Sequence, residues 1–157
     1  MAIIVGENSY ITVAEADAIL VDYFDTESWD TQTTLNKEKA LKMATRNIDT
    51  LSLQGKKYLL DQELEFPRNY AIFDEDGEIE AKVKIATAVE SLKILDNRSN
   101  ETMSDIANLG ITGRSIEGTA VSYSEKIIMS ERKRKDDLMS EVARKELKYW
   151  IKKSFKR

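Results

Sequence analysis

The stretch NSYITVAEAD, residues 8–17, joins an apolar N-terminal segment to the first helix that the sequence predicts. The segment before it, MAIIVG at residues 1–6, has the run of apolar residues that is typical of a short strand. Thr12 and Glu15 stand three positions apart at the start of an apolar run, so their side chains can each satisfy an unpaired backbone N–H at a helix start. The stretch therefore predicts a tight passage from a strand at residues 1–6 into a helix that begins at Val13.

Apolar residues recur at helical spacing in four segments, which predicts a mainly α protein: a small bundle of about four helices with a short β element. The first three helices are expected at residues 13–24, 35–51 and 81–95. The last is expected to begin near Ser130 and to extend to the end of the chain. The stripes that predict them are, in chain order, Val13, Ala16, Ile19, Leu20 and Tyr23; Leu41, Ala44, Ile48 and Leu51; Ala81, Ile85, Ala88, Val89, Leu92 and Leu95; and Met139, Val142, Ala143, Leu147, Trp150, Ile151 and Phe155.

The segments between the helices are expected to be polar connections and short β elements. Trp29 stands in a polar connection at residues 25–33, where its indole is expected to close the edge of the core. Phe66-Pro67-Arg68 is predicted to be an ordered, non-helical corner, because the residue before a proline favours extended geometry. After a polar break at residues 97–104, the segment GITGRSIEGTAVSYSE at residues 110–125 is expected to form two short strands joined by a turn.

Two loops contain residue types that bind ligands in other proteins. The carboxylates around Asp76-Gly77 match a calcium-binding loop only in fragments, which favours a solvated turn. The glycines of the GITG stretch, Gly110 and Gly113, match a GxxG nucleic-acid clamp only in spacing, and turn formation explains them more simply. We therefore expect neither a metal nor a cofactor.

The composition sets further limits on the class of protein. A chain of 157 residues is long enough for one compact domain. It contains no cysteine and no histidine, which excludes Ser-His-Asp and Cys-His catalysis, disulfides and the usual zinc sites. No apolar run approaches the roughly 18 residues of a membrane span, and the N-terminus lacks the pattern of a signal peptide. We expect a protein that is not an enzyme and does not enter a membrane.

The charges of the chain are unevenly distributed. The formal net charge is -4, but residues 144–157 contain seven basic residues and one acid, which gives +6 there and -10 over residues 1–143. An acidic body with a basic C-terminal segment can indicate a site for nucleic acid, for an acidic protein partner or for neighbouring acidic subunits.

Several of these stretches together resemble one family, the phage proteins often labelled DnaT-like single-stranded-DNA-binding, many of which are similar to head–tail connector or adaptor proteins. The resemblance covers nearly the whole chain, and its motifs are structural rather than catalytic. They are MAIIVGENSYITVAEADAIL at residues 1–20, KALKMATRNIDTL at residues 39–51, LEFPRNY at residues 64–70, the acidic turn followed by KIATAVESLKIL at residues 84–95, and GRSIEGTAVSYSE at residues 113–125.

The resemblance implies a structural virion protein at the head–tail junction, synthesised in the host cytoplasm. Such a subunit forms a ring, implied to be twelvefold, beneath the portal protein, and it prepares the surface for the next neck or tail protein. DNA passes through the channel without sequence-specific binding. Residues 1–130 would form the connector core and residues 131–157 a C-terminal helix that docks on the portal, within a single domain overall.

The same resemblance assigns the portal contact to the end of the chain. Its apolar residues would anchor docking and its basic residues would select an acidic surface. The first group is Trp150, Ile151 and Phe155, and the second is Lys152, Lys153, Lys156 and Arg157. The alternative is that this segment packs within its own chain as a fourth helix with a solvated basic face.

Single-stranded-DNA binding is the alternative function. Tyr149 and Trp150, together with the basic tail, could provide a stacking platform and positive charge, although the acidic body makes a continuous basic groove hard to place. An enzyme using two carboxylates would need two acids in contrasting environments, and the sequence indicates no such pair.

Overall fold

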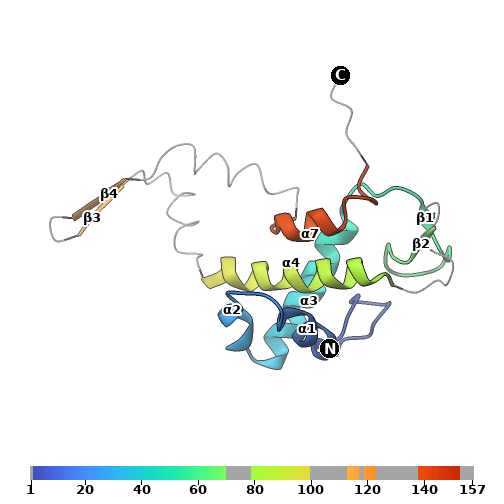
Figure 1. The fold of residues 1–157 in the computed structure, drawn as a ribbon, viewed down its shortest axis with the longest axis horizontal. Coiled ribbons are helices and arrows are strands. Elements are labelled where there is room, and N and C mark those ends of the chain that lie inside the picture. The colour runs from blue at the N-terminus through green and yellow to red at the C-terminus, as the bar shows by residue number, and fades with distance from the viewer. Residues whose placement is uncertain (1, 70–78, 100–112, 117–118, 123–137, 153–157) are drawn as a thin grey trace, which may run out of the picture.

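The structure is a computed structural model that describes residues 2–69, 79–99, 113–116, 119–122 and 138–152 (Figure 1). These residues are mainly helical, as predicted. The helices are α1 (Val13–Leu20), α2 (Glu27–Asp30), α3 (Thr34–Asp49), α4 (Ala81–Ser99) and α7 (Glu141–Glu146). The strands pair in two antiparallel hairpins, β1 (Lys56–Lys57) with β2 (Arg68–Asn69) and β3 (Gly113–Ile116) with β4 (Thr119–Ser122).

The start of α1 confirms the predicted capping box. The backbone N–H of Glu15 donates to the hydroxyl of Thr12 at 3.1 Å, and the backbone N–H of Thr12 donates to the carboxylate of Glu15 at 2.9 Å. The helix ends at Leu20, earlier than predicted, and α3 spans Thr34–Asp49 where residues 35–51 were predicted.

The predicted strand at residues 1–6 is wrong within the described residues. The chain turns back at Gly6, which has a φ of +86°, and Gly6 N–H donates to the carbonyl of Ser9 at 2.9 Å. The Asn8 side chain accepts the N–H of Ile4 at 3.0 Å, and Val5 pairs only with Ser9 in an isolated bridge. Because the local turn uses these backbone groups, they are not available for pairing with a strand elsewhere.

Helix α4 is the centre of the molecule. Figure 1 shows α7 on one side of it and α1 and α2 on the other, and α3 also packs against it. Most of its circumference is therefore buried, whereas the sequence predicted one stripe that included Ala81, which is exposed. The helix also continues to Ser99, so the predicted break at residues 97–104 is wrong over its first three positions. The buried residues of α4 are Val83, Ala86, Thr87, Ala88, Val89, Glu90, Ser91, Ile94 and Leu95.

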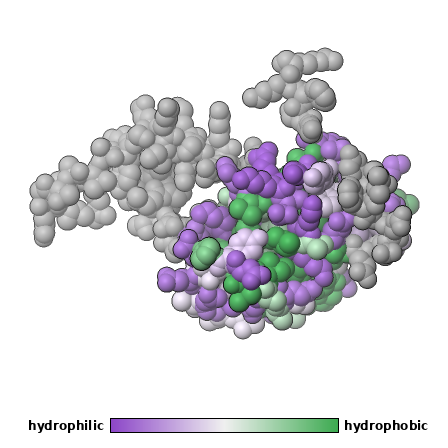
Figure 2. All heavy atoms as spheres, viewed as in Figure 1, coloured by the Kyte–Doolittle hydropathy of each residue, from purple (hydrophilic) through white to green (hydrophobic). Residues whose placement is uncertain are grey.

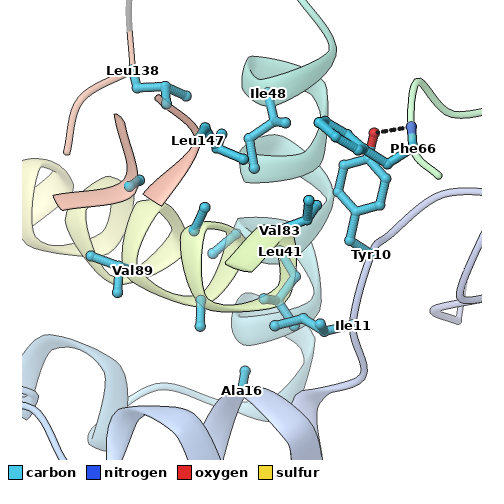
Figure 3. Close-up of a cluster of buried hydrophobic side chains, with 14 of the residues drawn as sticks. Tyr10, Ile11, Ala16, Leu41, Ile48, Phe66, Val83, Val89, Leu138 and Leu147 are labelled. Atoms are coloured by element: carbon cyan, nitrogen blue, oxygen red, sulfur yellow. Dashed lines mark hydrogen bonds between the residues drawn. The ribbon is translucent and has the colours of Figure 1, made fainter. Parts of the chain in front are cut away.

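An aromatic cluster closes one end of the core. Phe66 packs edge-on against Tyr10 and Trp150, with ring centroids 5.8 and 5.7 Å apart. The corner at Phe66-Pro67-Arg68 is ordered and non-helical, as predicted, and its backbone is fixed from several directions. Phe66 N–H donates to the Tyr10 hydroxyl at 3.2 Å (Figure 3), and the Arg68 guanidinium donates to the carbonyls of Gln54 and Gly55 at 2.8 Å.

The long C-terminal helix predicted from Ser130 is wrong within residues 138–152, where α7 spans only six residues. The chain leaves the helix at Leu147 because the following residues bond to the segment after α3. Gln54 N–H donates to the carbonyl of Trp150 at 2.6 Å, Lys152 N–H donates to the carbonyl of Ser52 at 2.8 Å, and Leu53 pairs with Ile151. The indole of Trp150 is buried in the core.

The predicted hairpin near residue 117 is confirmed as β3 and β4, with Arg114 opposite Val121 and Ile116 opposite Thr119. In Figure 1 it lies apart from the helical body. Trp29 is buried at the core edge, as predicted, although the connection that carries it contains the additional short helix α2. The turn predicted at Asp76-Gly77, the glycine turn at residues 110–112 and the segments 123–137 and 153–157 lie outside the described residues.

Glu90 connects three segments that are distant in sequence. Its side chain is fully buried in α4 and accepts hydrogen bonds from the Asn47 side chain at 2.9 Å, from Met139 N–H at 3.0 Å and from Ser140 N–H at 2.9 Å. Ser140 in turn caps α7 through its hydroxyl. The carboxylate therefore holds the start of the C-terminal segment against α3 and α4.

We predict that Glu90→Ala lowers the free energy of unfolding by about 3–5 kcal/mol, because three N–H donors lose their acceptor in a buried site. The measurement is urea denaturation followed by circular dichroism. The control is Glu63→Ala, the same substitution at an exposed position, which should change stability by less than about 0.5 kcal/mol. A Glu90→Ala protein as stable as this control would contradict the role assigned to the carboxylate.

A second prediction concerns acid stability. The Lys84 ammonium hydrogen-bonds to Glu15 at 2.8 Å and, with the Thr12 contacts, lowers the pKa of the Glu15 carboxyl below its ordinary value of 4.5. A lowered pKa in the folded state means that the stabilisation is present above pH 4.5 and is lost as the pH falls through the folded-state pKa. Wild type should therefore melt above Glu15→Gln at pH 7, and the gap should close on acidification. A gap that stays constant down to pH 3 would contradict this assignment.

Candidate functional site

The residues predicted to dock on the portal fall in three environments. Trp150 is only 2% exposed and packs against Phe66, while Ile151 is half-buried and pairs with Leu53. Lys152 is exposed. Phe155, Lys153, Lys156 and Arg157 lie outside the described residues. The structure thus shows the indole of Trp150 inside its own chain, and a contact of these residues with a portal protein stays a prediction.

An exposed tyrosine between two lysines marks a basic surface. The ammonium groups of Lys82 and Lys148 each lie 4.8 Å from the centre of the Tyr149 ring, which is 46% exposed. Lys82 comes from the first turn of α4, and the other two residues follow α7. A ring face attracts cations, so the tyrosine holds two positive charges close together. We call Lys82, Lys148 and Tyr149 the basic surface.

The sequence indicated only part of this surface. Tyr149 and the basic tail were visible as a local pattern, but Lys82 is far away in the chain and carries no signal that connects it with Tyr149. Packing of α7 on α4 brings them together.

A second surface, of opposite charge, follows α1. The chain has seven Asp and Glu residues and neither Lys nor Arg before Lys37. In this region Asp22, Asp25 and Glu27 are exposed around Phe24, whose side chain is 94% exposed. Asp25 has a φ of 59°, a conformation that Asp tolerates better than most residues, and it turns the chain towards α2. We call Asp22, Phe24, Asp25 and Glu27 the acidic surface.

The two surfaces lie near opposite ends of α4. Asp25 and Glu27 line a hollow together with Leu95 and Asp96, near the C-terminal end of α4. The basic surface includes Lys82, at its N-terminal end. With a rise of about 1.5 Å per residue, Lys82 and Asp96 are about 20 Å apart along the helix axis. Each copy of the chain therefore carries an acidic and a basic surface at separate places.

A third exposed feature is the loop between β1 and β2. Leu60 is fully exposed and Leu59 is also exposed, yet the side chains of Gln62 and Lys57 hold the loop backbone. Gln62 accepts the N–H of Leu59 at 2.9 Å and donates to the carbonyls of Leu64 and Pro67 at 2.8 and 3.0 Å. Apolar side chains are thus presented on a fixed backbone. On the face shown in Figure 2, hydrophobic residues also interrupt the hydrophilic surface.

The buried ionisable groups around Tyr10 support the fold. Burial, together with the neighbouring Asp49 carboxyl, raises the pKa of the Tyr10 hydroxyl, and burial raises the pKa of Asp49. The Tyr10 hydroxyl donates to Asp49, and Asp49 also accepts the N–H of Glu65 at 3.4 Å. These bonds attach the corner at Phe66 to α3 and leave both groups engaged within the chain.

The described residues form neither a metal site nor a membrane span. That part of the chain contains no group of three or more His, Cys, Asp or Glu side chains that could hold a metal ion. Nor does any helix within it combine the length and the apolar character needed to cross a membrane.

The amino-acid sequence matches a known protein family over most of its length. Residues 2–149 match the family described as "Putative DnaT-like ssDNA binding protein", and the chain belongs to this family. Comparison with curated proteins and with solved structures gave no match.

The structure predicts where the chain can be shortened. All the hydrogen bonds described between the C-terminal segment and the core are made at or before Lys152. A chain ending at Lys152 should keep the wild-type free energy of unfolding to within about 0.5 kcal/mol. A chain ending at Tyr149 should lose about 3–5 kcal/mol, because it lacks the buried indole.

Chemical denaturation of both truncated chains checks this prediction. Equal stability of the two chains would mean that the Trp150 contacts do not support the fold. The comparison also decides how the basic tail can be studied, since removing residues 148–157 together would remove core residues as well.

Proposed function

We propose that the protein is a structural subunit of a virion head–tail connector, which forms a ring beneath the portal and joins the head to the neck or tail. The support is twofold. The stretches that resemble connector proteins extend over nearly the whole chain, and the structure presents large apolar side chains on a fixed backbone. The role requires no catalytic step.

The observation that carries the proposal is the exposure of Phe24 and Leu60. Phe24 is 94% exposed, and Leu60 is fully exposed with the exposed Leu59 beside it in the chain. Exposed apolar side chains mark a contact site when they form one continuous patch, which is the role we propose for these residues in the assembled ring. Phe24 is flanked by α1 and α2, and the loop with Leu60 is fixed by Gln62. Binding through a pre-ordered segment loses little conformational entropy, which favours association.

The proposal predicts a measurable assembly. Light scattering after size exclusion should show a ring for the protein alone, or a stoichiometric complex once the portal protein of the same phage is added. Phe24→Ser with Leu60→Ser should weaken that assembly at least tenfold, because burial of two large apolar side chains is lost. Leu35→Ser on α3, which also removes an exposed leucine, serves as the matched control and should assemble like wild type.

The result that contradicts the proposal is a protein that stays monomeric with the portal present and is absent from purified particles. If the double variant assembles as well as wild type while the ring still forms, the connector role stands and the two apolar residues are not its contacts.

Single-stranded-DNA binding is the second candidate. It is favoured by the family description and by the exposed Tyr149 ring between two ammonium groups, a combination that can stack a base and attract a phosphate. Anisotropy of a labelled oligothymidine separates the two candidates. DNA binding predicts affinity that falls steeply with salt and is lost in Tyr149→Ala, and no binding at low salt would remove this candidate.

A further inference from the structure

We infer that copies of this chain contact one another head to tail, with the acidic surface of one copy bound to the basic surface of the next. The inference rests on the proposed ring and names the residues that would form its subunit contact. The acidic surface is Asp22, Phe24, Asp25 and Glu27, and the basic surface is Lys82, Lys148 and Tyr149.

The two surfaces carry complementary charges. Three exposed carboxylates lie within three positions of Phe24 in the chain, and two ammonium groups each lie 4.8 Å from the centre of the Tyr149 ring. Opposite potentials on two facing patches favour the correct orientation and raise the rate of association. Each surface also includes an exposed aromatic residue, so apolar contact can accompany the charge pairs.

The positions of the two surfaces favour a head-to-tail contact. A symmetric dimer that placed either surface against its own equivalent would bring like charges face to face, which opposes that arrangement. A contact between two different surfaces is heterologous, and repetition of such a contact closes into a ring when the rotation allows it. The separation of about 20 Å along α4 places the two surfaces far enough apart for one copy to contact two neighbours.

A second copy of the chain fits the basic surface better than nucleic acid does. Nucleic acid would also be attracted by Lys82 and Lys148, but residues 1–143 carry a net charge of -10, which repels a phosphate backbone around the site. The acidic surface of a second copy brings its carboxylates to the lysines at a defined place. A second copy of the chain is therefore the partner that accounts for both surfaces together.

A charge-swap experiment tests this contact. One variant, Asp22→Lys with Glu27→Lys, reverses the acidic surface; Asp25 is kept because its positive φ disfavours most other residues. The other variant, Lys82→Glu with Lys148→Glu, reverses the basic surface. Each variant alone brings like charges together, so its dissociation constant for assembly should rise at least tenfold.

The mixture of the two variants provides the decisive readout. In a one-to-one mixture every contact again joins opposite charges, provided that the two variants alternate, and light scattering should show assembly restored to the wild-type level. The matched controls carry the same charge changes at exposed positions elsewhere and should assemble like wild type. They are Glu7→Lys with Glu141→Lys, and Lys39→Glu with Lys56→Glu.

Each other outcome overturns the inference. If both variants assemble like wild type, or if both fail and the mixture is not restored, these surfaces do not form the contact, while the connector role still stands on the wild-type ring. If only the variant Lys82→Glu with Lys148→Glu loses assembly, and the same variant also loses oligonucleotide binding, the basic surface is a nucleic-acid site. If wild type stays monomeric even with the portal protein, the proposed function fails and the inference fails with it.

Discussion

The buried carboxylate of Glu90 connects the parts of this molecule that are most distant in sequence. A charged side chain without solvent contact is costly unless hydrogen bonds replace its hydration, and here Asn47, Met139 and Ser140 supply three donors. Two of those donors are the backbone groups that lead into α7. The same hydrogen bonds therefore replace the hydration of the Glu90 carboxylate and fix the start of α7 on α4.

The other contacts of the C-terminal segment depend on this attachment. With residues 138–140 fixed on α4, α7 packs along the helix and delivers Leu147 and Trp150 to the core. Trp150 then packs edge-on against Phe66, and the backbone beyond it pairs with the segment after α3. The same packing brings Tyr149 to Lys82, so the basic surface exists only because the C-terminal segment is held in place.

The sequence predicted the features whose causes are local. The capping box at Thr12 and Glu15, the corner at Phe66-Pro67 and the hairpin of β3 and β4 each depend on a few neighbouring residues, and all three were predicted correctly. The acceptor role of Glu90 could not be predicted, because its partners lie 43 to 50 positions away. The C-terminal helix was predicted too long because apolar residues at helical spacing also fit a short helix followed by a turn into the core.

The candidate surfaces were also only partly predictable from the sequence. An excess of acid early in the chain and of base at its end was visible in the sequence, but the pairing of Lys82 with Tyr149 and the position of Asp25 beside Leu95 came from the fold. Charge that is spread along the chain becomes two separate patches near the two ends of α4. We propose that a connector subunit uses these patches to bind its neighbours.

The most direct measurement is zero-length crosslinking of an assembled mixture of isotopically light and heavy protein, because a carbodiimide joins a lysine amine only to a carboxylate in contact with it. The account predicts mixed-isotope crosslinks between Lys82 or Lys148 of one copy and Asp22, Asp25 or Glu27 of another. Assembled protein whose crosslinks between copies all lie elsewhere would contradict it.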